Sequence, residues 1–280
     1  MKRKIILFFI VGLIIYSCKE KIDLTLDSSY VRLVVEGAVT DEARVQSVTL
    51  TLTSDYLSNK PSPRVSGAMV KIVGMNQSGQ QETVMPLTES EPGFYTTQGA
   101  FKGIAGKWYK VVIQNVTIGN TTKDYESYPE MLSLAPPIDS LLLKSNSTHD
   151  KWNISVSFHD NEATHDFYMF NYSRNGIMQT DTISKIAYAS DEYFNGQFLS
   201  LERVHRGITD LEYGDTVTEY LSVIPERFYK FLVAANAEAE PDVPLFAGPP
   251  ANVPGNINNG ALGFFNVYSV SKASTIAKHR

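Results

Sequence analysis

The sequence of 280 residues contains only one cysteine, Cys18. A single thiol cannot form a disulfide within the chain, so small disulfide-stabilised folds are excluded and the hydrophobic core must hold the protein together. A chain of this length can bury a core large enough for that purpose. A free thiol outside the cytoplasm would be exposed to oxidation, so the presence of Cys18 needs a chemical explanation.

The chain also lacks an excess of positive charge. It has 25 Lys and Arg against 30 Asp and Glu, which gives a formal net charge of −5 at pH 7. An acidic protein is not attracted to phosphate backbones or to anionic lipid headgroups. We therefore predict no nucleic-acid partner, and any attachment to a membrane must come from something other than a basic patch.

Sequence motifs of catalysis are missing as well. The sequence has no nucleophile-elbow motif, no zinc-protease helix motif and no glycine-rich phosphate loop. Carboxylate pairs such as Glu89 and Glu91 cannot be assessed without geometry, because the carboxylates of a glycosidase are defined by their separation in space. We predict no catalytic residues and expect that the protein is not an enzyme.

Histidine and cysteine, the nitrogen and sulfur ligands of metals, are few: the chain has five histidines and one cysteine. Among the five histidines, two belong to the densest polar segment, His159-Asp160-Asn161-Glu162-Ala163-Thr164-His165-Asp166, and the others are His149, His205 and His279. This segment could supply oxygen and nitrogen ligands, but its spacing matches no compact ligand pattern. A polar loop between two strands explains it better, so we predict no metal site and no cofactor.

The N-terminus has the layout of a secretory signal peptide over residues 1–17. Three positive residues, Lys2, Arg3 and Lys4, precede an apolar run over residues 5–15 that is shorter than the roughly 20 residues needed to cross a bilayer. Ile15-Tyr16-Ser17-Cys18 resembles a bacterial lipobox, which implies cleavage before Cys18 and its acylation with fatty acids such as palmitate. The alternative is an N-terminal transmembrane anchor.

Lipidation would remove the free thiol and hold the protein on a membrane. No second apolar segment long enough to span follows Cys18, so we expect a protein that is anchored to the outer membrane through a tether over residues 18–28 and does not cross it. The tether begins Lys19-Glu20-Lys21, with charges of both signs. It leaves open whether the protein faces the cell surface or the periplasm.

The first half of the mature chain reads as short strands. Alternating apolar and polar residues at Val31–Gly37 and Val48–Thr53, and further runs near Gly67–Val73, Phe94–Thr97 and Trp108–Ile113, are separated by turn signals roughly every ten residues. This pattern predicts an N-terminal β-sandwich over residues 29–134.

The second half opens at Ala135-Pro136-Pro137, which reads as a linker because proline interrupts strand pairing. Strands are predicted at 138–143, 153–158, 167–172, 215–223 and 262–270, and Asn175-Gly176 predicts a two-residue hairpin. Apolar residues after Pro225 recur at helical spacing, which predicts one amphipathic helix near 225–240. We assign 135–273 to a C-terminal β-rich module and 274–280 to a tail.

Several motifs in order resemble one family: Val34-Val35-Glu36-Gly37, Val65–Val70, Pro92-Gly93-Phe94-Tyr95, Gly106–Tyr109, Pro136–Ser140 and Asn256–Phe265. The chain is similar to the Bacteroidota lipoproteins grouped as domain of unknown function family 4249, over nearly its whole mature length. Ala261 adds a residue between the two glycines of the last motif. The resemblance implies an accessory role beside TonB-dependent outer-membrane receptors and a transthyretin-like first half.

Together these features predict a mainly β fold of two antiparallel β-sandwich modules, the first Ig-like or transthyretin-like and the second fibronectin-like. The predicted function is a lipoprotein that serves as a non-catalytic, ligand-binding partner of a TonB-dependent transporter in nutrient uptake; the alternative is a structural or adhesive surface lipoprotein. We expect any ligand site at the module junction and the loop before the last strand, with Phe246, Asn256, Asn258 and Asn259 as candidates. A loop packed back on the sandwich explains the same residues.

Overall fold

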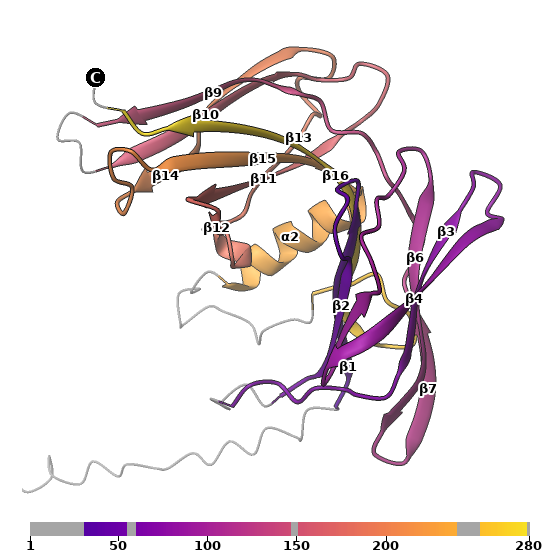
Figure 1. The fold of residues 1–280 in the computed structure, drawn as a ribbon. Coiled ribbons are helices and arrows are strands. Elements are labelled where there is room, and N and C mark those ends of the chain that lie inside the picture. The colour runs from indigo at the N-terminus through magenta and orange to yellow at the C-terminus, as the bar shows by residue number, and fades with distance from the viewer. Residues whose placement is uncertain (1–30, 55–59, 147–150, 240–252, 279–280) are drawn as a thin grey trace, which may run out of the picture.

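The computed structural model describes residues 31–54, 60–146, 151–239 and 253–278. The predicted signal peptide, Cys18 and Phe246 lie outside these residues. The described chain forms a 13-stranded sheet and a separate three-stranded sheet, with one α-helix, α2, between the two halves of the molecule (Figure 1). The prediction of a mainly β fold with one helix is confirmed.

The first half contributes eight strands that surround one hydrophobic core. Their order in the large sheet is β1-β2-β5-β4-β3-β6-β7, with β8 also paired to β6. Alternation places Val35, Leu50 and Ile72 in this core, each fully buried. The strands are β1 (Leu33–Thr40), β2 (Ser47–Leu52), β3 (Met69–Met75), β4 (Gln81–Glu91), β5 (Phe94–Thr97), β6 (Trp108–Ile118), β7 (Thr121–Glu126) and β8 (Glu130–Met131).

The second half is a sandwich of two sheets. The three-stranded sheet β14-β10-β9 packs on β11, β15 and the end of β16, and the core between them includes Ile154, Phe158 and Leu221. The elements are β9 (Ile138–Ser145), β10 (Trp152–His159), β11 (Phe167–Arg174), β12 (Ile177–Met178), the 3-10 helix η1 (Ile183–Lys185), β13 (Ala187–Ser190), β14 (Phe198–Ile208), β15 (Thr216–Ile224), α2 (Glu226–Ala239) and β16 (Leu262–Ile276).

Strand β16 joins the two halves because it pairs with a strand of each. Its first part, from Leu262 to Tyr268, pairs with β1, and its second part, from Ser269 to Ile276, pairs with β15. The β1–β16 pair is parallel, which departs from the purely antiparallel modules that we expected. Parallel strands need a long connection, and here almost the whole chain separates the two. The first core also takes Phe265 and Val267 from β16.

Gly263 permits the close approach of β16 to β1. Its φ is +88°, and a Cβ atom there would lie 2.1 Å from the backbone oxygen of Val35. Only glycine fits such a position without strain. The predicted hairpin is confirmed too, since Asn175 and Gly176 both have positive φ and join the paired residues Arg174 and Ile177.

Helix α2 covers the face of β11 and β15 that points away from the sandwich core. It begins directly after Pro225, as the sequence predicts, and buries Leu232 against Met169 and Ile224. The second half therefore has three layers, with α2 lying in the angle between this sheet and the first half (Figure 1). Among the described residues, no helix has the length and apolar character to cross a membrane.

Candidate functional site

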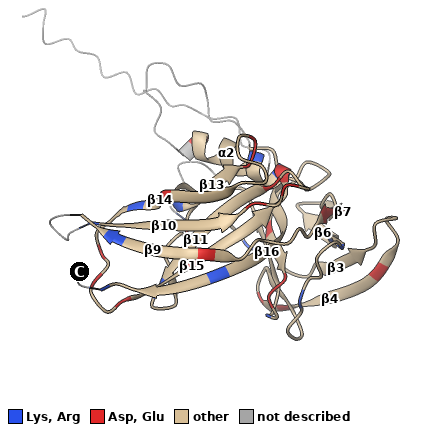
Figure 2. Cartoon of the chain, turned by 90° about the horizontal axis from the view of Figure 1, so that it is seen from above, with Lys and Arg blue, Asp and Glu red and all other residues tan. Residues whose placement is uncertain are grey.

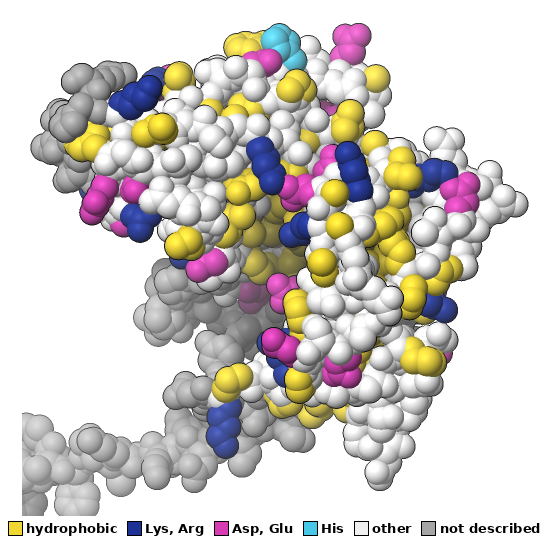
Figure 3. Space-filling model, in the orientation of Figure 1, with side chains coloured by type: hydrophobic (Ala, Val, Ile, Leu, Met, Phe, Trp, Pro, Cys, Tyr) yellow, Lys and Arg dark blue, Asp and Glu magenta, His cyan; other side chains and the backbone are white. Residues whose placement is uncertain are grey.

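A groove of about 590 Å³ lies at the junction of the two halves. Strands β1, β2 and β16 form one side of it, and β11, the segment from β12 to η1, and helix α2 form the other. Figure 3 shows hydrophobic side chains gathered in the angle between the two halves. A concave site of this volume at a domain junction is the usual form of a small-molecule site.

Part of the groove is lined by aromatic rings that come from both of its sides. Phe228 and Phe231 from α2 stack on each other with ring centroids 5.8 Å apart, and Phe264 of β16 lies 4.9 Å and 5.4 Å from them. Met169 and Leu232 extend this apolar surface. Rings in such arrangements offer a large, fixed contact area to an apolar ligand group.

Polar residues line the groove from both of its sides. Glu36 and Thr49 of the first half, Asn171 and Thr180 of the second, and Arg44 all line the groove. The Nε atom of Arg44 donates a hydrogen bond of 3.3 Å to the Thr40 hydroxyl, which restrains the guanidinium. A few hydrogen-bonding groups beside an apolar surface suit a ligand that is itself amphipathic.

The predicted ligand-binding asparagines hold the loop before β16 in place. Asn256 is fully buried, and its amide exchanges two hydrogen bonds of 2.9 Å with the backbone of Phe265. Asn258 accepts from the backbone N–H of Glu126 at 2.8 Å, and Asn259 donates to the backbone of Asp124 at 2.8 Å. None of these three lines the junction groove, and Phe246 lies outside the described residues. The alternative of a loop packed on the sandwich describes them better.

The polar segment after β10 belongs to a cluster of three buried carboxylates. Oxygen atoms of Asp160, Asp166 and Asp191 all lie within 4.8 Å of one another. Burial raises the pKa of Asp166, and the charges of Asp160 and Asp191 act in the same direction. Carboxylate oxygens are the ligands that a hard cation such as Ca²⁺ prefers, and three of them meet here.

Hydrogen bonds within the protein already reach each of these carboxylates, and that of Asp166 accepts from the Thr164 hydroxyl at 2.8 Å. Asp160 accepts from the hydroxyl of Tyr168 and, at 2.6 Å, from the backbone N–H of Gly196. Asp191 accepts from the backbone N–H of Asp166 at 2.7 Å. These bonds tie the segment after β10 to the loop after β13. Of the two histidines in this segment, His159 pairs with Asp139 at 2.7 Å, outside the cluster. The Nδ1 atom of His165 lies 3.5 Å from Asp191 Oδ1, although the His165 side chain is otherwise exposed.

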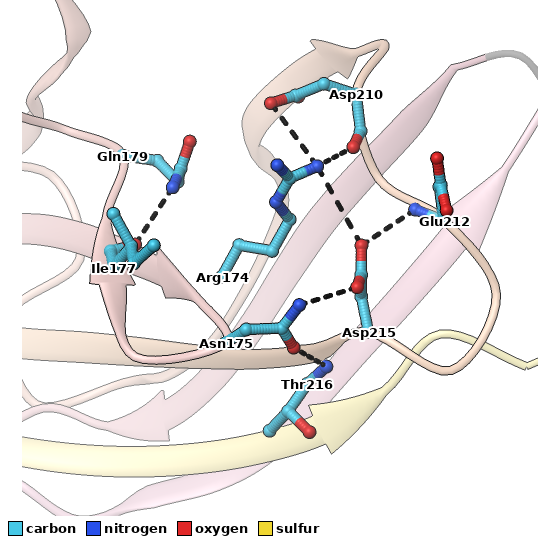
Figure 4. Close-up of polar contacts among 8 residues, drawn as sticks. All are labelled: Arg174, Asn175, Ile177, Gln179, Asp210, Glu212, Asp215 and Thr216. Atoms are coloured by element: carbon cyan, nitrogen blue, oxygen red, sulfur yellow. Dashed lines mark hydrogen bonds and ion pairs between the residues drawn. The ribbon is translucent and has the colours of Figure 1, made fainter.

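A second polar cluster closes the far end of the C-terminal sandwich (Figure 4). Asp215 accepts hydrogen bonds from Asn175 at 2.6 Å and from the backbone N–H of Glu212 at 2.9 Å. These bonds, with Arg174 nearby, lower the pKa of Asp215. The cluster joins the Asn175-Gly176 turn to the start of β15, so its geometry serves the fold. Along the ribbon, the positions of Lys and Arg and those of Asp and Glu are interspersed (Figure 2).

Sequence reasoning predicted a site at the junction but not the residues that line it. Phe228 and Phe231 were visible as the apolar face of a helix, which is equally the pattern of a core-packing helix. Glu36 and Thr49 were visible only as the outward residues of strands. A single sequence carries no signal that identifies these residues as groove residues. The groove forms from segments about 190 residues apart along the chain, and their proximity appears only in the folded structure.

Fold and site together define a mainly β protein with a ligand-sized groove between two halves that share a strand. The family described as "Domain of unknown function (DUF4249)" matches residues 19–274, and the chain belongs to this family. No curated protein matches the chain. Among solved structures, the chicken interferon gamma receptor alpha chain aligns over 69% of this chain and 89% of its own, with 12% sequence identity and a TM-score of 0.19.

Proposed function

We propose that this protein is a lipid-anchored, non-catalytic accessory protein of the outer membrane. It binds an amphipathic ligand in the junction groove and hands it to a TonB-dependent transporter. The observation that carries this proposal is the groove itself, whose volume of about 590 Å³ falls within the range of small-molecule sites.

The composition of the groove supports binding rather than catalysis. Its described lining offers aromatic rings, amides, hydroxyls, carboxylates and one guanidinium, but no imidazole or thiol that could activate a nucleophile. Such a lining can hold a ligand by ring contacts together with hydrogen bonds.

The N-terminus supports the anchor. Residues 1–18 have the charged start, the short apolar run and the cysteine of a processed lipoprotein. The protein has net negative charge, so acyl chains rather than electrostatic attraction would keep it on the membrane. Intact-mass measurement of protein from the membrane fraction tests this: we expect a chain that begins at an acylated Cys18. A product that retains residues 1–17 would contradict it.

Ligand binding can be tested with a matched pair of tryptophan variants. Ala38→Trp adds a large ring inside the groove, because Ala38 lines it. Val233→Trp adds the same ring to α2 at a position that is 42% exposed and does not line the groove. We would titrate each protein with the fluorophore 1-anilinonaphthalene-8-sulfonate, which is amphipathic and aromatic.

We expect saturable binding of one dye molecule to the wild type and to Val233→Trp, and loss of that binding in Ala38→Trp. Steric exclusion is the reason, since the added ring occupies the volume that the dye needs. Equal binding by both variants would show that the dye site lies elsewhere and would contradict the groove as a ligand site.

A further inference from the structure

The junction groove contains two charges of opposite sign that the protein itself leaves unpaired. Among the described residues that line the groove, the charged ones are Glu36, Arg44 and Asp181. Asp181 already pairs with Lys185, at 2.7 Å. Glu36 and Arg44 are exposed, and neither forms an ion pair with another described residue. Both charges are therefore available to a ligand in the groove.

Strand β1 sets the distance between these two charges. Glu36 pairs with Phe264 of β16, so its carboxylate lies at the level of the phenylalanine rings. Thr40 lies four residues further along β1 and on the same face, because alternate side chains of a strand share a face. The Nε atom of Arg44 donates a hydrogen bond of 3.3 Å to the Thr40 hydroxyl, so the guanidinium lies at this second level. Four residues of strand span about 13 Å, which is the distance between the two levels.

Side-chain amides line the groove between the two levels. Asn266 pairs with Ala38, which is midway between them. Asn266 is only 5% exposed, and its Oδ1 atom accepts from the backbone N–H of Val267 at 2.9 Å. No described residue accepts from its Nδ2 atom, which keeps solvent-accessible surface. The side-chain amide of Asn171, on the other side of the groove, also has no partner among the described residues. A largely buried donor without an acceptor is costly, so this position favours a ligand with carbonyl groups.

We propose that the junction groove binds short linear peptides of three or four residues with free ends. This inference rests on the proposed function, because it names the ligand class of the same groove. The N-terminal ammonium pairs with Glu36, the C-terminal carboxylate pairs with Arg44, and the peptide carbonyls between them accept from the two asparagine amides. An apolar side chain of the peptide packs on the rings of Phe228, Phe231 and Phe264.

The distance between the charges favours a peptide over smaller zwitterions. An extended chain spans at most about 3.3–3.6 Å per residue, so three or four residues reach about 10–14 Å. A single amino acid carries both charges on one carbon atom, and a phosphoethanolamine headgroup separates them by only a few bonds. Neither reaches from Glu36 to Arg44. The groove volume of about 590 Å³ also suits a ligand of several residues.

Isothermal titration of the purified full chain at pH 7 with the tripeptide alanyl-phenylalanyl-alanine tests the proposal. Three comparison probes are its N-acetylated form, which lacks the ammonium, its C-terminal amide, which lacks the carboxylate, and free phenylalanine. We expect the unmodified tripeptide to bind at one site. Each blocking group should weaken binding by about threefold or more, the effect of a partly exposed ion pair. Phenylalanine and phosphoethanolamine should bind more weakly than the tripeptide.

Variants show which charge holds which end of the peptide. Glu36→Gln should weaken binding of the unmodified tripeptide but not of the N-acetylated form, since the ammonium that Glu36 pairs with is then absent. Arg44→Gln should act in the same way on the unmodified tripeptide and its amide. Lys102→Gln and Glu192→Gln are the matched controls, because both residues are exposed and lie outside the described lining of the groove. Neither control should change any of the affinities.

Displacement of the bound dye separates this inference from the proposed function. Dye binding that Ala38→Trp abolishes but the tripeptide does not displace would keep the groove as a ligand site and overturn the peptide. Equal affinity for the blocked and unmodified tripeptides, binding of phenylalanine or phosphoethanolamine as tight as that of the tripeptide, or tripeptide binding that survives Ala38→Trp would also overturn it. If neither the dye nor the tripeptide binds, both proposals fail.

Discussion

Replacing Asn256 with alanine removes the side-chain amide that hydrogen-bonds to β16 on the side where this strand has no neighbouring strand. Strand β15 pairs with β16 only from Ser269 onward, so Phe265 has no strand on that side. The Asn256 amide takes the place of a strand there, since it donates to the carbonyl of Phe265 and accepts from its N–H, both at 2.9 Å. The variant leaves two buried backbone groups without partners, at a cost of about 1–3 kcal/mol each. We expect the free energy of unfolding to fall by roughly 2–6 kcal/mol.

Urea unfolding followed by circular dichroism measures this loss as a lower midpoint at unchanged slope. Asn195→Ala is the matched control, because Asn195 is exposed and its loss should change stability by less than about 0.5 kcal/mol. If Asn256→Ala is as stable as the control, the amide does not support β16. The reasoning that removes Asn256 from the ligand-binding candidates would then be refuted.

Two further predictions concern the backbone and pH. Gly263→Ala should destabilise the protein by about 2–5 kcal/mol, because the left-handed backbone is strained for alanine and the added Cβ clashes with Val35. Gly79→Ala should cost only about 1–2 kcal/mol, because this glycine has the same backbone strain but open surroundings. Equal urea midpoints for the two variants would contradict this prediction. Burial raises the pKa of Glu219, which lies 3.3 Å from His205. The contribution of Glu219 to the free energy of unfolding is therefore complete below its ordinary pKa of 4.5 and is lost as the pH rises through its raised pKa. Glu219→Gln should flatten the decline in the free energy of unfolding that urea unfolding measures between pH 4 and pH 8. An unchanged pH profile would contradict this role of Glu219.

The regular strands and the helix could be predicted because their residues alternate or recur without interruption. Strand β14 was missed for the opposite reason. Its pairing with β10 shifts register between Ile154 and Val156, and Arg203 has a positive φ of 61°, so buried and exposed residues do not alternate along it. The parallel β1–β16 pair could not be predicted either, because nothing local indicates which distant strand is the partner.

The site was less predictable than the fold. Asn256 and Asn258 drew attention as polar residues in a turn, but only three-dimensional pairing shows that Phe265 and Glu126 occupy their amides. Asp191 joins Asp160 and Asp166 because β13 pairs with β11, a contact that the spacing of the three residues does not reveal. A polar residue in a loop is ambiguous until its hydrogen-bond partners are known.

Purification of the tagged full chain from detergent-solubilised outer membrane tests the central claim most directly. We predict that a TonB-dependent transporter is recovered in stoichiometric amount with the wild-type protein and with Val233→Trp. Recovery of the protein alone, at a yield that shows intact membrane attachment, would contradict a role in transport and favour a structural or adhesive lipoprotein.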